Sequence, residues 1–139
     1  MIVVDASVAV KWFLPEPLSD AAESILTADE ARTAPEHILV EVGQALLRSW
    51  RGGGISLEHA REAIADLTSY VQLTPTHELA ARALDIAAEA SCSNYDALYV
   101  AASERLGATL VTADKRLYAL LNSVGKSETI RLLAPLGDA

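Results

Sequence analysis

Ile2-Val3-Val4-Asp5 is a β-branched run that stops at a carboxylate, and it predicts a buried strand with an acid at its carboxyl end. Thr109-Leu110-Val111-Thr112 has a similar character, and Asp114 follows two residues after it. Weaker strand patterns cover residues 32–34, 71–73 and 130–133. Helical patterns separate these runs, mostly without hairpin signals. We therefore expect a parallel sheet of about four to five strands flanked by helices.

The helical stretches are bounded by Ser, Pro and Gly residues in cap positions. Ser7 is expected to cap the first helix, and Pro35 suits the first position of the third. The expected helices cover residues 7–13, 19–31, 35–51, 76–90, 94–106 and 114–124, and one more begins at residue 56. The chain of 139 residues is long enough for one domain with a core, and it has no repeat, low-complexity tract or linker. We expect a single α/β domain over residues 1–139.

The composition is that of a folded, acidic protein, with 51% hydrophobic and 22% charged residues. Eleven basic against nineteen acidic residues give a net charge of −8. This charge argues against a protein that grips nucleic acid by bulk positive charge, but not against one that meets phosphate through metal ions. The single cysteine cannot form an internal disulfide, and no apolar run approaches the roughly 20 residues that span a bilayer. The first residues lack the basic segment of a signal peptide. We expect a cytoplasmic protein without membrane contact.

Three aspartates stand where open α/β sheets bind ligands or where burial is costly. Asp5 and Asp114 follow two strands, at the carboxyl edge that forms the ligand crevice of such sheets. Each is also a favoured N-cap for the helix that follows, and both interpretations are open. Asp96 lies in the first turn of a helix that is apolar on almost every side, so burial without a partner would be costly. The alternative for Asp96 is exposure near the positive end of that helix.

Glu41 adds a fourth carboxylate at the edge of the apolar stripe of its helix, where a lone glutamate is usually solvated. Four clustered acids would repel one another unless a cation neutralised them, and carboxylate oxygens are ligands of Mg²⁺ and Mn²⁺. Two such ions can activate a water and stabilise a leaving oxygen in phosphodiester hydrolysis. Ser7 and Thr112 stand two residues from Asp5 and Asp114, where their hydroxyls suit a supporting outer shell.

Several other catalytic motifs do not occur in the sequence. It has no phosphate-binding loop of the Gly-x-x-x-x-Gly-Lys type, no Gly-x-Ser-x-Gly nucleophile motif and no His-Glu-x-x-His zinc motif. His37, His59 and His77 are scattered along the chain, and we expect them to be surface histidines.

Four segments carry a further signal through their order and spacing. They are Val3-Val4-Asp5-Ala6-Ser7-Val8 with Lys11-Trp12-Phe13-Leu14-Pro15-Glu16, Ala34-Pro35-Glu36 to Glu41-Val42, Tyr95-Asp96-Ala97-Leu98-Tyr99-Val100-Ala101, and Leu110-Val111-Thr112-Ala113-Asp114-Lys115-Arg116-Leu117. Together they resemble the PIN-domain family, and in particular its VapC toxins of type II toxin–antitoxin systems. The resemblance covers essentially the whole chain.

This resemblance implies a parallel sheet between helices and an endoribonuclease that depends on Mg²⁺ or Mn²⁺. The catalytic, metal-binding acids of the family carry over onto Asp5, Glu41, Asp96 and Asp114, and Asn94 falls at a supporting position. The implied substrate is RNA, cleaved at its phosphodiester bonds. The resemblance also implies a homodimer and a VapB-like antitoxin, whose tail lies in a groove and offers an Arg to the acidic pocket.

Two other functions are open at this point. One is a phosphoryl-transfer domain of receiver or phosphatase type, although a haloacid-type phosphatase would carry a second Asp where Ser7 stands, and the acidic pair and late-strand Lys of a receiver are not evident. The other is a non-catalytic binding module with a PIN-like fold. Divalent-metal-dependent RNA cleavage would separate the ribonuclease from both.

Five side chains near the predicted site have two possible roles. The basic ones could contact flanking RNA phosphates or be solvated surface charges: Lys11, Lys115 and Arg116. The aromatic ones suit an antitoxin contact and core packing equally well: Trp12 and Phe13.

Overall fold

β1 (Ile2–Val4) is the central strand of a parallel sheet in the computed structural model, which describes residues 1–137. These residues form five strands in the order β3-β2-β1-β4-β5, and each neighbouring pair runs parallel. The other strands are β2 (Arg32–Pro35), β3 (Gln72–Thr74), β4 (Thr109–Thr112) and β5 (Ile130–Leu132). The predicted α/β class, with a short parallel sheet flanked by helices, is confirmed.

The chain changes direction across the sheet at β1. It builds outward from β1 to β2 and β3, and then returns to the other side of β1 for β4 and β5. Val4 pairs with Val111, so β1 and β4 end side by side. The ligand crevice of an open α/β sheet lies at such a switch in strand order, beyond the carboxyl ends of the strands. Asp5 and Asp114 follow these two ends.

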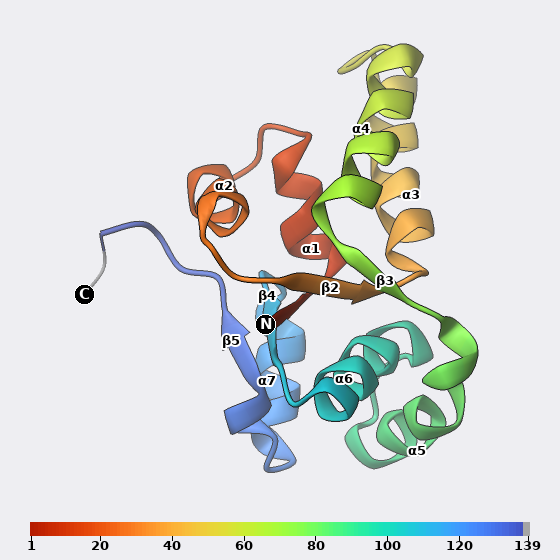
Figure 1. Cartoon of the computed structure of the whole chain (residues 1–139), viewed down its shortest axis with the longest axis vertical. Coiled ribbons are helices and arrows are strands. Elements are labelled where there is room, and N and C mark those ends of the chain that lie inside the picture. Colours follow the sequence, from red (N-terminus) through yellow and green to blue (C-terminus); the bar gives the residue numbers. More distant parts are fainter. Residues whose placement is uncertain (138–139) are drawn as a thin grey trace.

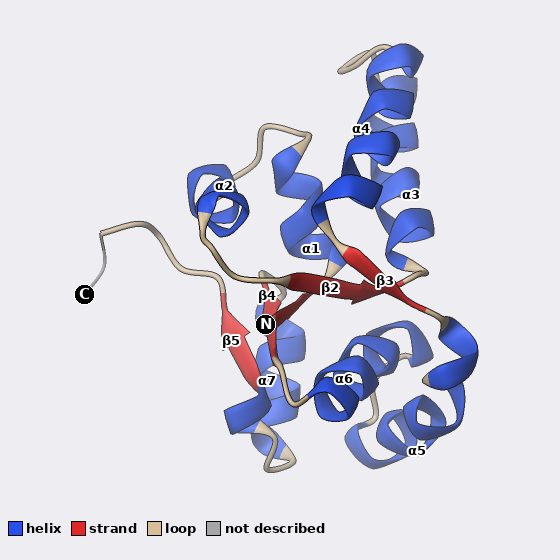
Figure 2. Cartoon of the chain, in the orientation of Figure 1, coloured by secondary structure: helices blue, strands red, loops and turns tan. Residues whose placement is uncertain are grey.

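The described residues also contain seven α-helices and three short 3-10 turns. The helices are α1 (Ala6–Ala9), α2 (Ser19–Thr27), α3 (Ile38–Arg51), α4 (Leu57–Tyr70), α5 (Ala80–Ala90), α6 (Asn94–Leu106) and α7 (Lys115–Ser123). In Figure 1, α1 to α4 lie on one side of the sheet and α5 and α6 on the other, and Figure 2 shows the strands between these layers. α7 packs on β4 and β5. Within residues 1–137, no helix is long and apolar enough to span a bilayer.

α6 is buried along most of its length. Ala97 to Ser103 are all buried, because α6 lies against β1, β2 and β4 and also packs on α5. This burial agrees with the apolar pattern that surrounds almost the whole helix in the sequence. The first turn of α6 is thereby fixed beside the sheet, and that turn carries Asp96.

Helix boundaries differ from the expected ones at several positions, and α2, for instance, ends at Thr27 and not at residue 31. Asp5, and not Ser7, caps the first helix. Pro35 ends β2, where it pairs with Thr74, instead of opening a helix, because its restricted φ is compatible with an extended strand end as well as with a helix start. The helix expected from residue 76 begins with a 3-10 turn over Thr76–Glu78.

Buried apolar side chains between Ile2 and Leu133 in the sequence form one hydrophobic core, which joins both helical layers to the sheet. The predicted domain extends to residue 139, and residues 138–139 lie outside the described residues.

Trp12 and Phe13 pack partly buried against this core. Phe13 stacks on Tyr70 with ring centroids 6.1 Å apart, and Trp12 meets the same ring edge-on at 6.0 Å. Nε1 of Trp12 donates a hydrogen bond of 2.8 Å to the carbonyl oxygen of Ala22. Both side chains therefore take part in packing against the core.

Candidate functional site

Asp5 is the most buried carboxylate of residues 1–137, with 5% of its surface exposed. It caps α1 by accepting hydrogen bonds from the backbone N–H of Ser7 at 3.0 Å and of Val8 at 3.4 Å. Its oxygens also accept hydroxyl hydrogen bonds of 2.5 Å, Oδ1 from Ser7 and Oδ2 from Thr112. Burial raises the pKa of Asp5 to about 6, and these hydrogen bonds limit the rise. Asp5 is therefore both a helix cap and a buried, fully hydrogen-bonded carboxylate.

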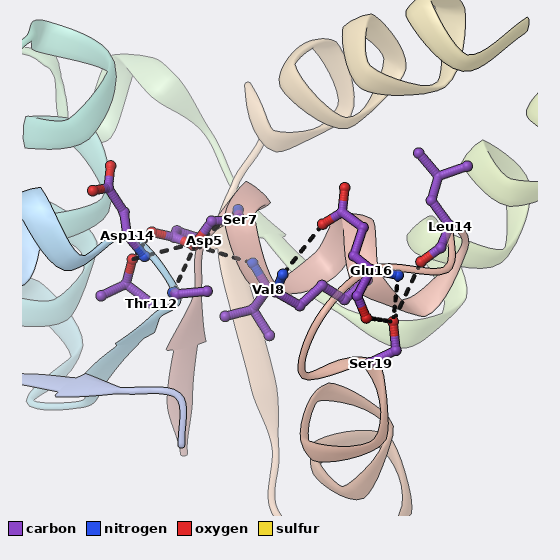
Figure 3. A network of polar contacts seen from close by, with 10 residues as sticks. Asp5, Ser7, Val8, Leu14, Glu16, Ser19, Thr112 and Asp114 are labelled. Atoms are coloured by element: carbon purple, nitrogen blue, oxygen red, sulfur yellow. Dashed lines mark hydrogen bonds and ion pairs between the residues drawn. The ribbon is translucent and has the colours of Figure 1, made fainter. Parts of the chain in front are cut away.

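Ser7 and Thr112 join the segments that follow β1 and β4. Oγ1 of Thr112 donates to Asp5 and accepts the N–H of Asp114 at 3.0 Å. Oγ of Ser7 donates to Asp5 and accepts the N–H of Ala113 at 2.9 Å. Figure 3 shows Asp5 beside both hydroxyls, with Asp114 close by. Each hydroxyl has one hydrogen, and Asp5 receives both, so the two hydroxyls fix the orientation of the carboxylate.

Asp114 and Asp96 share one cationic neighbour, the guanidinium of Arg116. Asp114 caps α7 by accepting the N–H of Leu117 at 3.1 Å. Nη2 of Arg116 lies 3.2 Å from Oδ2 of Asp96 and 3.8 Å from Oδ2 of Asp114. Most of the Arg116 side chain is exposed, so solvent weakens both ion pairs. The guanidinium nevertheless bridges carboxylates that come from two different elements.

Asp96 is held at the start of α6, with 20% of its side chain exposed. Its backbone N–H donates a hydrogen bond of 3.1 Å to Oγ of Ser93, the N-cap of the helix. Burial raises the pKa of Asp96, and the hydrogen bond and charge of Arg116 oppose the rise. A partly buried carboxylate of this kind is stabilised by a cation beside it.

Glu41 faces the start of α6 from α3, with about a third of its side chain exposed. The hydroxyl of Tyr99 donates to Oε1 of Glu41 at 2.7 Å, and Nε2 of His37 lies 3.1 Å from the same oxygen. Burial acts to raise the pKa of Glu41, but the contacts with His37 and Tyr99 outweigh it, and the pKa lies below its usual value. Glu41 is therefore ionised at neutral pH.

Tyr99 connects Glu41 to the other acids. It lies on α6 three residues after Asp96, so the two side chains share one face of the helix. Burial, together with the charges of Glu41 and Asp5, raises the pKa of Tyr99, so its hydroxyl keeps its proton and remains a donor. Tyr99 thereby joins α3 to the face of α6 that carries Asp96.

These contacts link the four predicted acids at the carboxyl edge of the sheet. Each acid is held by donors of its own, and no three His, Cys, Asp or Glu side chains of residues 1–137 lie close enough together to hold one metal ion. Coordination of one ion by several of the acids would therefore require side-chain rotations. The links are Asp5 to Asp114 through Thr112, Asp114 to Asp96 through Arg116, and Glu41 to α6 through Tyr99.

The remaining predicted residues lie at the margin of this network. Asn94 is the exposed first residue of α6, and its side chain makes no hydrogen bond with residues 1–137. Lys11 pairs with Glu16 at 3.2 Å, and most of the Lys11 side chain is buried. Lys115 is exposed at the first position of α7.

The expectation of surface histidines is confirmed for His59 and His77 and is wrong for His37. Only 12% of the His37 side chain is exposed, and it contacts Glu41. Its position four residues before Glu41 was the available signal, because residues with this spacing meet on one face of a helix. Tyr99, at the corresponding spacing of three from Asp96, was also not singled out as a site residue.

Comparisons of the sequence with known proteins agree with this architecture. The sequence profile described as PIN domain matches residues 2–121. Ribonuclease VapC3 from Pyrobaculum aerophilum is 28% identical over 119 residues, which cover 84% of this chain and 91% of that protein.

Two solved structures share the fold. A crystal structure of a Pyrobaculum aerophilum protein matches with a TM-score of 0.68 and 23% identity, over 95% of this chain and 88% of that chain. A chain of a toxin–antitoxin complex from Klebsiella pneumoniae matches with a TM-score of 0.63 and 13% identity, over 86% of this chain and 91% of that chain. At such identities the likeness is one of fold.

Proposed function

This chain belongs to the PIN domain family, and from that premise we propose that it is the toxin of a type II toxin–antitoxin system, an endoribonuclease that requires Mg²⁺ or Mn²⁺. The observation that carries the proposal is the linkage of Asp5, Asp96 and Asp114 through Thr112 and Arg116 beside the switch in strand order between β1 and β4. Glu41 is joined through Tyr99 to the helix that carries Asp96. The similarity to Ribonuclease VapC3 supports RNA as the substrate.

The donor set suits a hard divalent cation. Its atoms are carboxylate oxygens backed by hydroxyls, which Mg²⁺ and Mn²⁺ prefer. Arg116 already stands as a cation between two of the acids. Divalent cations at this edge would lower the pKa of a bound water and stabilise the leaving oxygen of a phosphodiester. The residues proposed to hold them are Asp5, Glu41, Asp96 and Asp114.

The other residues of the site orient these ligands and the RNA. Ser7 and Thr112 fix both oxygens of Asp5, which keeps that carboxylate in one rotamer. Arg116 and Lys115 stand at the start of α7, where a flanking phosphate can reach their charges. Asn94, at the exposed start of α6, is proposed as a supporting residue at the surface where RNA would approach the acids.

We take the whole chain, residues 1–139, as the nuclease domain. The family profile ends at residue 121, yet the strand beyond it, β5, pairs with β4 and completes the sheet. The N–H of Leu133 donates a hydrogen bond of 2.7 Å to the carbonyl oxygen of Thr112. Residues after the profile thus help to hold a strand end on which the site depends. The free Cys92 suits a reducing compartment, and we place the activity in the cytoplasm.

The proposed partners are a VapB-like antitoxin and a second copy of this chain. A chain at −8 with four carboxylates at one edge attracts a cationic segment. An antitoxin tail with an Arg fits this site, because a guanidinium can bridge two carboxylates, as Arg116 does within the chain.

The proposal is tested by incubating the purified protein with a mixed RNA substrate in Mg²⁺, in Mn²⁺ and with a chelator. Cleavage in either metal, its loss with chelator and its loss in the Asp5→Asn variant are the expected results. Phosphorylation of the protein by a small phosphodonor, without RNA cleavage, would indicate a phosphoryl-transfer domain instead. Neither activity would leave a non-catalytic binding module.

A further inference from the structure

His37 is nearly buried at the start of α3 and faces the first turn of α6. Its Nε2 lies 3.1 Å from the carbonyl oxygen of Tyr95 and 3.1 Å from Oε1 of Glu41. Its ring also packs on Tyr99, with ring centroids 4.6 Å apart and planes tilted by 47°. One imidazole thus contacts the residue before Asp96, the Glu41 carboxylate and the tyrosine that donates to that carboxylate.

The chemistry of these neighbours decides which nitrogen carries hydrogen. A backbone carbonyl and a carboxylate can only accept hydrogen bonds. Nε2 of His37 must therefore carry the hydrogen, and this hydrogen is shared between Tyr95 and Glu41. The arrangement ties α3 to α6 through a donor that has no freedom to rotate its hydrogen away.

The contacts on Glu41 are one-sided. Among residues 1–137, the hydrogen-bond and ion-pair contacts of this side chain all fall on Oε1, from Tyr99 and His37. Oε2 therefore keeps its lone pairs for another ligand. A carboxylate with one oxygen fixed by two groups has little rotational freedom left, so binding through its other oxygen would cost little further conformational entropy.

The other nitrogen of His37 indicates that this placement is not optimised for stability. Nδ1 is buried and has no hydrogen-bond partner among the described residues. A buried polar atom left without a partner loses its hydrogen bond to water without gaining another, which destabilises the fold. Such an exception in a folded protein calls for an explanation, and sites of function are where exceptions are expected.

We propose that His37 is a positioning residue of the carboxylate site: it holds Glu41 Oε1 and the Tyr95 carbonyl on one N–H, and thereby sets Glu41 relative to Asp96 for a divalent cation. The inference rests on the proposed function. His37 touches neither the cation nor the RNA and acts through Glu41, through Tyr99 and through the first turn of α6.

The test compares cation binding and cleavage in three variants of the full chain. His37→Ala should weaken Mn²⁺ binding by about tenfold, the lower end of the effect of removing a group that orients a metal ligand. His37→Gln can place an amide N–H near the position of Nε2 and should recover most of the affinity. His37→Asn has a shorter side chain, which puts its amide near Nδ1, and it should not recover it. His59→Gln, on the exposed face of α4, is the matched control.

Mn²⁺ binding is followed by calorimetry and by the rise in melting temperature, without RNA. RNA cleavage is then measured at a series of Mn²⁺ concentrations. In His37→Ala, the Mn²⁺ concentration that gives the half-maximal rate should rise strongly, and kcat should change little. Unchanged Mn²⁺ affinity in His37→Ala, or equal affinity in the Gln and Asn variants, would overturn the inference. If the Ala variant does not fold, the comparison of Gln with Asn decides alone. Wild-type protein that cleaves no RNA would refute the proposed function instead.

Discussion

Oγ1 of Thr112 donates a hydrogen bond of 2.5 Å to Oδ2 of Asp5, so the ends of β4 and β1 are joined by one hydroxyl. The same oxygen accepts the N–H of Asp114. A fully buried threonine thus orients one acid and the start of the helix that carries another.

Thr112→Val keeps the shape of this side chain and removes its hydroxyl. The folded protein should lose about 1.5–3 kcal/mol at pH 7, because a buried charged carboxylate loses a donor. Thr112→Ser keeps the hydroxyl and should lose only about 1 kcal/mol for the missing methyl group. Urea unfolding in the presence of chelator measures both. Equal losses would show that the hydroxyl contributes nothing beyond packing.

Asp5→Asn should stabilise the protein in chelator, and the gain should depend on pH. The folded-state pKa of about 6 lies above the usual value of 3.8 for an aspartate, so ionisation of Asp5 costs stability as the pH rises through this range. The variant should match wild type near pH 4 and exceed it above pH 6, by up to about 3 kcal/mol for a shift of about two pKa units. Thermal melts from pH 4 to pH 8 follow this difference. A difference that is constant across this range would contradict the burial cost.

Asp96→Asn should lower RNA cleavage by more than about 100-fold and leave the melting temperature in chelator unchanged or higher. The amide removes a proposed cation ligand and relieves repulsion from the neighbouring carboxylate of Asp114. Asp85→Asn, on the exposed face of α5, is the control and should cleave like wild type. Cleavage by Asp96→Asn at the control rate would remove Asp96 from the site.

Much of this site could be predicted because its signals are local. The β-branched runs before Asp5 and Asp114 predicted both strands, and adjacent parallel strands bring their carboxyl ends together. The choice between helix cap and site residue was left open for these aspartates, and the structure shows that both side chains do cap helices. A cap and a proposed ligand are therefore compatible roles.

His37 was harder to recognise, because only its contact with Glu41 is local and its contact with Tyr95 is not. The carbonyl oxygen that it contacts lies 58 residues further along the chain. The first turns of α3 and α6, which carry Glu41 and Asp96, meet only because both helices pack at the same edge of the sheet. A periodic sequence pattern describes one helix and does not show how far apart two helices lie. The sequence alone consequently favoured a surface position for this histidine.

Arg116→Gln should strengthen Mn²⁺ binding by about twofold to fivefold, the range expected for an exposed ion pair. The guanidinium contacts Oδ2 of Asp96 and Oδ2 of Asp114, oxygens that the cation is proposed to use. The same change should raise the KM for RNA, since the proposed contact of Arg116 with a phosphate would be lost. Arg61→Gln, exposed on α4, is the control. Metal titration and cleavage kinetics at low salt measure both effects. A weaker Mn²⁺ affinity in Arg116→Gln would contradict competition between the guanidinium and the cation for these oxygens.

Association with an antitoxin should depend on salt and on metal. A basic tail that places an Arg among the four acids would compete with divalent cations for the same oxygens, so excess Mg²⁺ or added salt should weaken that part of the binding. Apolar contacts of the same partner would persist, because burial of apolar surface is not screened by salt.

The measurement is a titration of this protein with the product of the reading frame just upstream, at low and high salt, with RNA cleavage followed in parallel. Sedimentation at micromolar concentration reports the homodimer. A partner that binds tightly while cleavage continues would refute inhibition by the Arg of the tail. A strictly monomeric protein would refute the homodimer.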